Sequence, residues 1–164
     1  MIVRQTDPRL LHFMARLRFD DGLRRECRNA LSNLMEALPG VRAALLVSPD
    51  GYEVATKVAS AEEISTGELS AITTTITASV QELLARVECG PMSTAILEGE
   101  RGTVILVSVG GVCPVGLAVV IGLEHLTLGR ALHYVKDTAS TLKGVLAAEP
   151  VIPRAPRDLY RPVF

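Results

Sequence analysis

The chain has 164 residues, of which 48% are apolar and only 4% aromatic, with no tryptophan. This content predicts one domain with some extra chain and a core filled by Val, Leu, Ile and Ala. The net charge of −1 excludes a global field that would draw the protein to nucleic acid, although residues 1–28 hold seven arginines against four acids and residues 29–148 hold seven basic residues against twelve acids.

The first 21 residues are predicted to be a basic extension that is partly helical. In PRLLHFMARL the apolar residues share one helix face and the arginines lie elsewhere. Three interpretations stay open. The segment packs on the domain, docks on a partner or an acidic membrane surface, or is disordered.

A helix and a hairpin follow. Asp20 or Asp21 can cap a helix whose apolar residues recur from Leu23 to Leu38, and Pro39-Gly40 ends it. Residues 41–48 are apolar on both faces, as in a central strand. Residues 52–58 alternate after a tight PDG turn, so residues 41–58 are predicted to form a hairpin.

The middle helix, residues 67–88, is made of residues that favour strands. Seven of the ten residues in AITTTITASV are β-branched. The apolar residues nevertheless have helical spacing, and we expect them to face the sheet: Leu69, Ile72, Ile76, Val80, Leu83 and Val87.

The other side chains from 70 to 79 are all Ser, Thr or Ala, where a solvated face normally carries Glu, Lys and Arg. Small side chains let a second helix approach closely, and threonine hydroxyls can bond to helix carbonyls. This pattern predicts a helix packed on both sides. The alternative is a monomer whose N-terminal arm covers the helix.

Three short strands with glycine turns come next, within residues 92–122, and then a last helix from residue 128. The buried face of that helix is predicted to comprise Leu128, Leu132, Val135, Ala139, Leu142 and Leu146. The tail, residues 149–164, has four prolines and is predicted to be extended. The order of elements predicts an α+β sandwich.

The sequence resembles the roadblock (LC7-type) family. The resemblance rests on GVRAALLVSPDGYEVA, ILEGERGTVILVSVG and GLAVVIGLEHLTLGRALHYVKDTASTL, in that order. It implies a roadblock domain over residues 22–148 with a profilin-like fold: a five-stranded antiparallel sheet with the middle helix on one face and the first and last helices on the other.

The resemblance also implies a homodimer, or a heterodimer with a roadblock paralogue, built from the middle helix and the third strand. The residues expected at this dimer interface are Ser70, Thr73, Thr74, Thr77, Leu84, Thr94 and Ile96.

Family members regulate or scaffold motors and Ras-like small GTPases, and in bacteria a roadblock dimer is the activating partner of a gliding-motility GTPase. Because GTPase activators often insert an arginine, Arg42, Arg86 and Arg101 are candidate partner contacts. The alternative is that Arg101 only keeps an exposed turn soluble. The bacterial activator acts mainly by reshaping the GTPase switch regions, so the absence of an arginine finger would not contradict a role as a GTPase activator.

No motif for catalysis stands out. The sequence contains no GxxxxGK[ST] loop, no dinucleotide fingerprint, no GxSxG, and no metal spacing among His12, His125 and His133. We therefore expect no catalytic residue, cofactor or metal.

The location is expected to be cytoplasmic, without integral membrane association. No apolar run approaches the ~20 residues of a membrane span, and arginines and an aspartate interrupt any signal sequence near the start. Cys27, Cys89 and Cys113, an odd number, are predicted to be reduced packing residues.

The leading hypothesis is a non-enzymatic dimeric adaptor that binds a Ras-like small GTPase and modulates its nucleotide state, in bacterial motility or polarity. The alternative is a structural scaffold subunit that docks on a larger complex through its termini. A ligand-sensing module is a third hypothesis, from analogy between folds only.

Overall fold

The computed structural model describes residues 19–59, 63–110, 115–122 and 127–147. Predictions about the N-terminal extension, the proline-rich tail, Cys113, His12 and His125 lie outside these residues. The first described helix, α2, spans Asp21–Ala37. The carboxylate of Asp20 accepts a hydrogen bond from the Leu23 N–H at 2.7 Å and so caps the helix start. The helix ends before Pro39, and Gly40 turns the chain with a φ of 99°.

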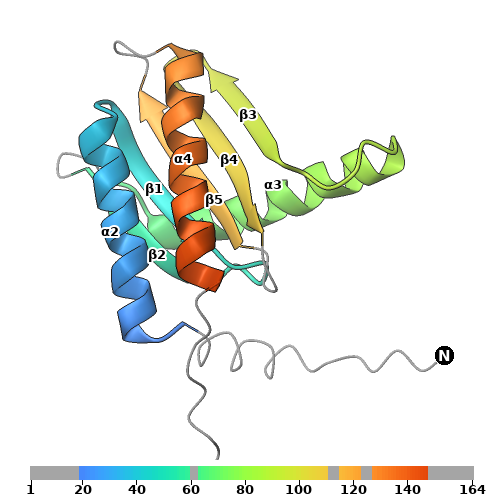
Figure 1. Cartoon of the computed structure of the whole chain (residues 1–164). Coiled ribbons are helices and arrows are strands. Elements are labelled where there is room, and N and C mark those ends of the chain that lie inside the picture. Colours follow the sequence, from blue (N-terminus) through green and yellow to red (C-terminus); the bar gives the residue numbers. More distant parts are fainter. Residues whose placement is uncertain (1–18, 60–62, 111–114, 123–126, 148–164) are drawn as a thin grey trace, which may run out of the picture.

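The sheet is antiparallel throughout, with the strand order β2-β1-β5-β4-β3 (Figure 1). Its strands are β1 (Val41–Val47), β2 (Glu53–Val58), β3 (Thr94–Gly99), β4 (Gly102–Gly110) and β5 (Val115–Gly122). The remaining helices are α3 (Thr66–Arg86) and α4 (Leu128–Ala147). The two edges of the sheet are therefore β2 and β3.

Helices cover both faces of the sheet, which confirms the predicted α+β roadblock fold. Helices α2 and α4 pack side by side on one face, and α3 crosses the other (Figure 1). Because side chains alternate along a strand, β1 serves both layers. Ala44 and Leu46 join the core under α2 and α4, whereas Ala43, Leu45 and Val47 join the core under α3.

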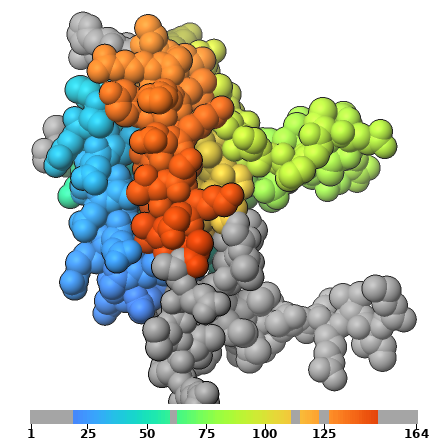
Figure 2. Space-filling model, viewed as in Figure 1, coloured from blue at the N-terminus to red at the C-terminus, as the bar shows by residue number. Residues whose placement is uncertain are grey.

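The two layers differ in extent. The core under α2 and α4 is continuous across the sheet, and α4 contributes Val135 and Leu142, both with no exposed surface. Helix α3 makes its main contacts with β2, β1 and β5. Its C-terminal half continues past the β3 edge and projects from the body (Figures 1 and 2). The sheet is thus closed on one face and partly open on the other.

One prediction about α4 needs correction. Leu128 is 38% exposed because it is the first residue of the helix, and the buried face instead includes Ala131 and Thr138, which were not predicted. Leu132 and Leu146 are partly buried against the core, as the periodicity indicates.

We predict that Asp20→Ala lowers the free energy of unfolding by about 1 kcal/mol, because the substitution removes the oxygen that caps the Leu23 N–H. Urea denaturation at a fixed protein concentration measures the change. Asp20→Asn is the control, because its side-chain oxygen can still accept the bond, and it should stay close to wild type. Equal losses for both variants would contradict the capping role.

Candidate functional site

The candidate site is the face formed by α3 and the sheet edge beside it. The expectation that the whole apolar stripe of α3 faces the sheet is wrong. Leu69 and Ile76 pack against the sheet core, but three other members of the stripe are exposed to solvent by more than half: Ile72 (54%), Leu83 (62%) and Val87 (57%).

The small polar flank of α3 lies over the sheet instead. Ser70 is 1% exposed, and Thr73, Thr74 and Thr77 are half-buried. The small side chains let the helix approach the β1–β2 turn closely: a Cβ on Gly51 would lie 3.6 Å from Thr74 Oγ1. The helix is therefore rotated by about a quarter turn from the predicted orientation, as one residue step turns a helix by about 100°.

A part-buried hydrogen bond stabilises this orientation of α3. Ser70 Oγ donates to Glu53 Oε1 at 3.1 Å, and this bond joins the first half of α3 to β2. In the adjacent turn, Ser48 Oγ accepts from the Tyr52 N–H at 3.0 Å and also bonds the Asp50 carboxylate. The start of α3 thus rests on a turn that is itself fixed by hydrogen bonds.

Several hydroxyls of α3 donate hydrogen bonds to carbonyls of the preceding helical turn. Thr74 Oγ1 donates to the Ser70 carbonyl at 2.9 Å, Thr75 Oγ1 to the Ala71 carbonyl at 3.1 Å, and Ser79 Oγ to the Thr75 carbonyl at 2.9 Å. These bonds to the preceding turn are the ones predicted from sequence. Packing on the sheet then offsets the low helix propensity.

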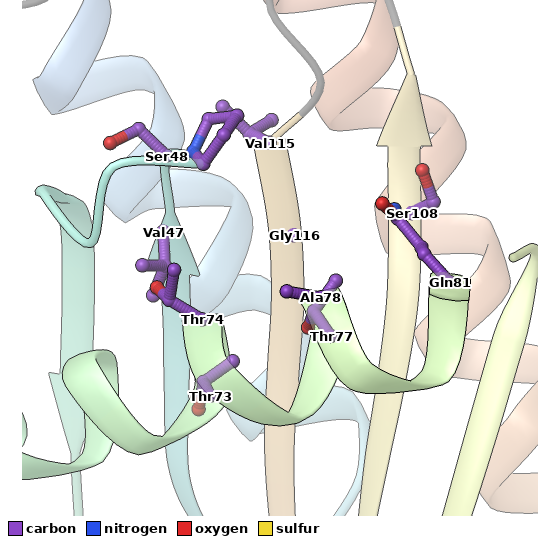
Figure 3. A pocket seen from close by; sticks show the side chains of 11 residues that line it. Val47, Ser48, Thr73, Thr74, Thr77, Ala78, Gln81, Ser108, Val115 and Gly116 are labelled. Atoms are coloured by element: carbon purple, nitrogen blue, oxygen red, sulfur yellow. The ribbon is translucent and has the colours of Figure 1, made fainter. Parts of the chain in front are cut away.

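A hollow of about 110 Å³ lies between α3 and the ends of three strands (Figure 3). None of the lining residues that the structure describes is charged. The lining residues are Val47, Ser48, Pro49, Thr73, Thr74, Thr77, Ala78, Gln81, Ser108, Val115 and Gly116. Sequence reasoning missed this feature, and its one sequence signal is Gly116 inside an otherwise apolar strand.

An exposed apolar surface, which we call the apolar ridge, lies on a different part of the same face. It consists of Ile72 and Leu83 on α3, Val87 directly after that helix, and Leu97 on β3, which is 40% exposed. Ile96, 39% exposed, pairs with Ile105 and therefore faces the α2 and α4 side of the sheet. Thr94, at the start of β3, has a buried Oγ1 without a hydrogen-bond partner among the described residues.

The residues predicted at a dimer interface lie in three different surroundings. Ser70 is buried within the single chain. Thr73, Thr74 and Thr77 line the hollow. Leu84 and Thr94 are half-buried, and Ile96 is exposed on the opposite face of the sheet, beside Ile105. The interface itself stays a prediction.

The three candidate arginines do not form one cluster. Arg101 is exposed in the β3–β4 turn. Arg42 lies at the same end of the sheet, since its Cδ is 3.7 Å from the Cβ position of Gly122 and Gly122 pairs with Gly102. Arg86 is on the projecting half of α3, where its Nε contacts Glu82 Oε1 at 2.7 Å in an exposed pair.

The buried Cys27 thiol lies in the core under α2 and α4, on the other side of the sheet. Burial, with a smaller contribution from Glu26, raises the pKa of the Cys27 thiol to about 11, so this thiol is a neutral packing group at pH 7.

Within the described ranges, no group of three or more His, Cys, Asp or Glu side chains could hold a metal ion. No described helix is both long enough and apolar enough to cross a membrane.

We predict that Ser70→Ala lowers the free energy of unfolding by about 1 kcal/mol, because Glu53 loses a hydrogen-bond donor in a part-buried site. Chemical denaturation measures the loss. Ser79→Ala is the matched control, because the Ser79 hydroxyl is exposed and bonds only its own helix. If the two variants were equally stable, the Ser70–Glu53 bond would not anchor α3.

Comparisons with known proteins agree with this geometry. The sequence model of the Roadblock/LC7 domain matches residues 29–114. No curated protein sequence matches the chain.

Several solved structures have the same fold. MglB in a tetrameric arrangement is 20% identical, with a TM-score of 0.70 over 77% of this chain and 92% of that one. The gliding protein MglB of Thermus thermophilus is 19% identical, with a TM-score of 0.69 over 77% and 93%. MglB of Myxococcus xanthus is 16% identical, with a TM-score of 0.69 over 77% and 91%. At these identities the likeness establishes the fold.

Proposed function

The chain belongs to the Roadblock/LC7 family, and on this basis we propose that it is a non-enzymatic dimeric adaptor that binds a Ras-like small GTPase and modulates its nucleotide state in the cytoplasm. The observation that supports the proposal most is the apolar ridge on a face that the single chain leaves partly open. A ridge of this kind is typical of a protein interface.

A second copy of the chain is the partner that fits the ridge. Helix α3 has 21 residues, about 30 Å at 1.5 Å per residue, and its second half extends past the β3 edge (Figure 1). Strand β3 is an edge strand with unpaired backbone groups. Two β3 edges related by a two-fold axis would bring each projecting α3 over the open sheet of the other copy.

We predict that Leu83→Asp converts the dimer to a monomer, because a charge would be buried at the centre of an apolar contact. Light scattering on the full chain measures the mass. Ala71→Asp, exposed on another side of α3, is the control and should keep the dimer mass. A dimer mass for Leu83→Asp would exclude the ridge as the interface.

The regulatory part of the proposal rests on the family and on the MglB-like fold. The adaptor would act by binding the switch segments of the GTPase and changing their conformation. This mode of action needs surface complementarity and no reacting group from the adaptor.

We predict that the full chain binds one of the Ras-like GTPases of its own organism in the GTP-loaded state and changes its rate of GTP hydrolysis. Single-turnover hydrolysis and calorimetry measure the two effects. Arg101→Ala should keep most of the rate effect, because the proposed mechanism does not insert an arginine. Absence of binding to every such GTPase in both nucleotide states would refute the regulator.

The scaffold hypothesis predicts a different result for truncated chains. The start of α2 and the end of α4 lie at the same end of the domain (Figure 1), so the chain enters and leaves the described domain at one end. Removing residues 1–18 or 150–164 should abolish partner binding by a scaffold of this kind, whereas GTPase binding by the domain body should persist.

A further inference from the structure

We propose that the hollow between α3 and the sheet receives one uncharged side chain of the GTPase partner. The inference deepens the proposed function and rests on it, because it names the place where the partner is held. Four features of the hollow support it: how it is formed, what lines it, how large it is and where it lies.

The hollow exists because a strand lacks one side chain. Gly116 has the same alternation in β5 as Ala118, which faces α3, so a Cβ at Gly116 would point into the hollow. The nearest atom to that Cβ would be the Val47 carbonyl oxygen at 4.0 Å. The opposite wall is Ala78, so both sides are small where a larger residue would fit.

The strand ladders are irregular at the same place. The β1–β2 register shifts between Leu46 and Val47, and the β4–β5 register shifts between Ser108 and Gly110. Val47 and Ser108 both line the hollow (Figure 3). Bulges of this kind bend strands and are common next to functional sites. The opening is therefore built into the sheet.

The lining offers hydrogen bonds that the chain does not use. The side chains of Thr73, Thr77, Gln81 and Ser108 have no hydrogen-bond partner among the described residues, whereas Thr74 is bonded to its own helix. The floor includes the apolar side chain of Val47, which belongs to the core under α3. An occupant with an apolar body and one hydroxyl or amide end would use both kinds of surface.

The charge of the lining residues and the volume of the hollow further restrict which chemical groups can occupy it. No Asp, Glu, Lys, Arg or His is among the lining residues that the structure describes, so a charged group would enter without a counter-charge. The volume of about 110 Å³ is below the roughly 150 Å³ of a cavity that encloses benzene. The hollow is thus too small for a nucleotide or an organic cofactor and fits part of a single side chain.

The hollow is separate from the apolar ridge. The two share no residue, and on α3 they lie on different sides, Thr77 and Gln81 facing the hollow and Ile72 and Leu83 facing solvent. A second copy on the ridge would leave the hollow open. A partner other than the chain itself is therefore the occupant that fits.

The test uses Gly116→Val, which fills the hollow from its floor. The strand accommodates valine well and the Cβ meets no close atom, so the variant should keep its thermal stability and dimer mass. The probe is the GTP-loaded Ras-like GTPase that binds the wild-type chain. We expect the Kd to rise about tenfold or more, as for loss of a central side-chain anchor, and Gly116→Ala to have a smaller effect.

Gly144→Ala is the matched control, because Gly144 lies on α4 and its Cβ position is equally open. It should bind like wild type. Equal affinities for wild type and Gly116→Val would overturn the hollow as the site while leaving the regulator intact. Absence of GTPase binding by the wild type would overturn both.

A second measurement does not depend on a variant. In the full chain with labelled Val and Thr methyl groups, the GTPase should shift the resonances of Val47, Thr73 and Thr77, which line the hollow. A complex that leaves all three unchanged would show that the partner binds elsewhere and that the hollow holds only water.

Discussion

The rotation of α3 about its own axis determines what this domain offers to partners. The part-buried Ser70–Glu53 hydrogen bond and the close approach of Thr74 to the β1–β2 turn place the small polar flank over the sheet. Because the apolar stripe lies about a quarter turn away, only its inner edge reaches the core and its outer edge faces solvent. The hollow and the apolar ridge both result from that one orientation.

The domain can keep such a ridge because the core on the other face of the sheet is extensive. Under α2 and α4 the core is continuous and includes Leu31, Leu117 and Leu142, none of which is exposed. Burial of each large apolar side chain contributes about 1.5–3 kcal/mol, so this layer supports the fold without full coverage on the α3 side. The exposed residues of the ridge can then be buried against a partner. Their burial contributes a similar free energy per side chain to association.

The fold was largely predictable from the sequence, and the orientation of α3 was not. Helical spacing, the PDG turn and the glycine turns give elements whose order matches the structure. Periodicity shows that Ile72 and Leu83 need an apolar partner, but it does not show whether that partner is the same chain. The decisive contact, Ser70 to Glu53, joins residues 17 positions apart through a side chain that propensity treats as neutral.

The same limit explains why the hollow was missed. A hollow is a relation between elements distant in the sequence, here α3, the end of β1 and the start of β5. Gly116 alone indicates only a weak point in a strand. Gly116 leaves a hollow only because Ala78 lies opposite it and the neighbouring strand pairs shift register. In a two-fold dimer each copy would contribute its own hollow. Self-association through the ridge would therefore present two equivalent sites. The dimer would bind at most two GTPase molecules, one at each site.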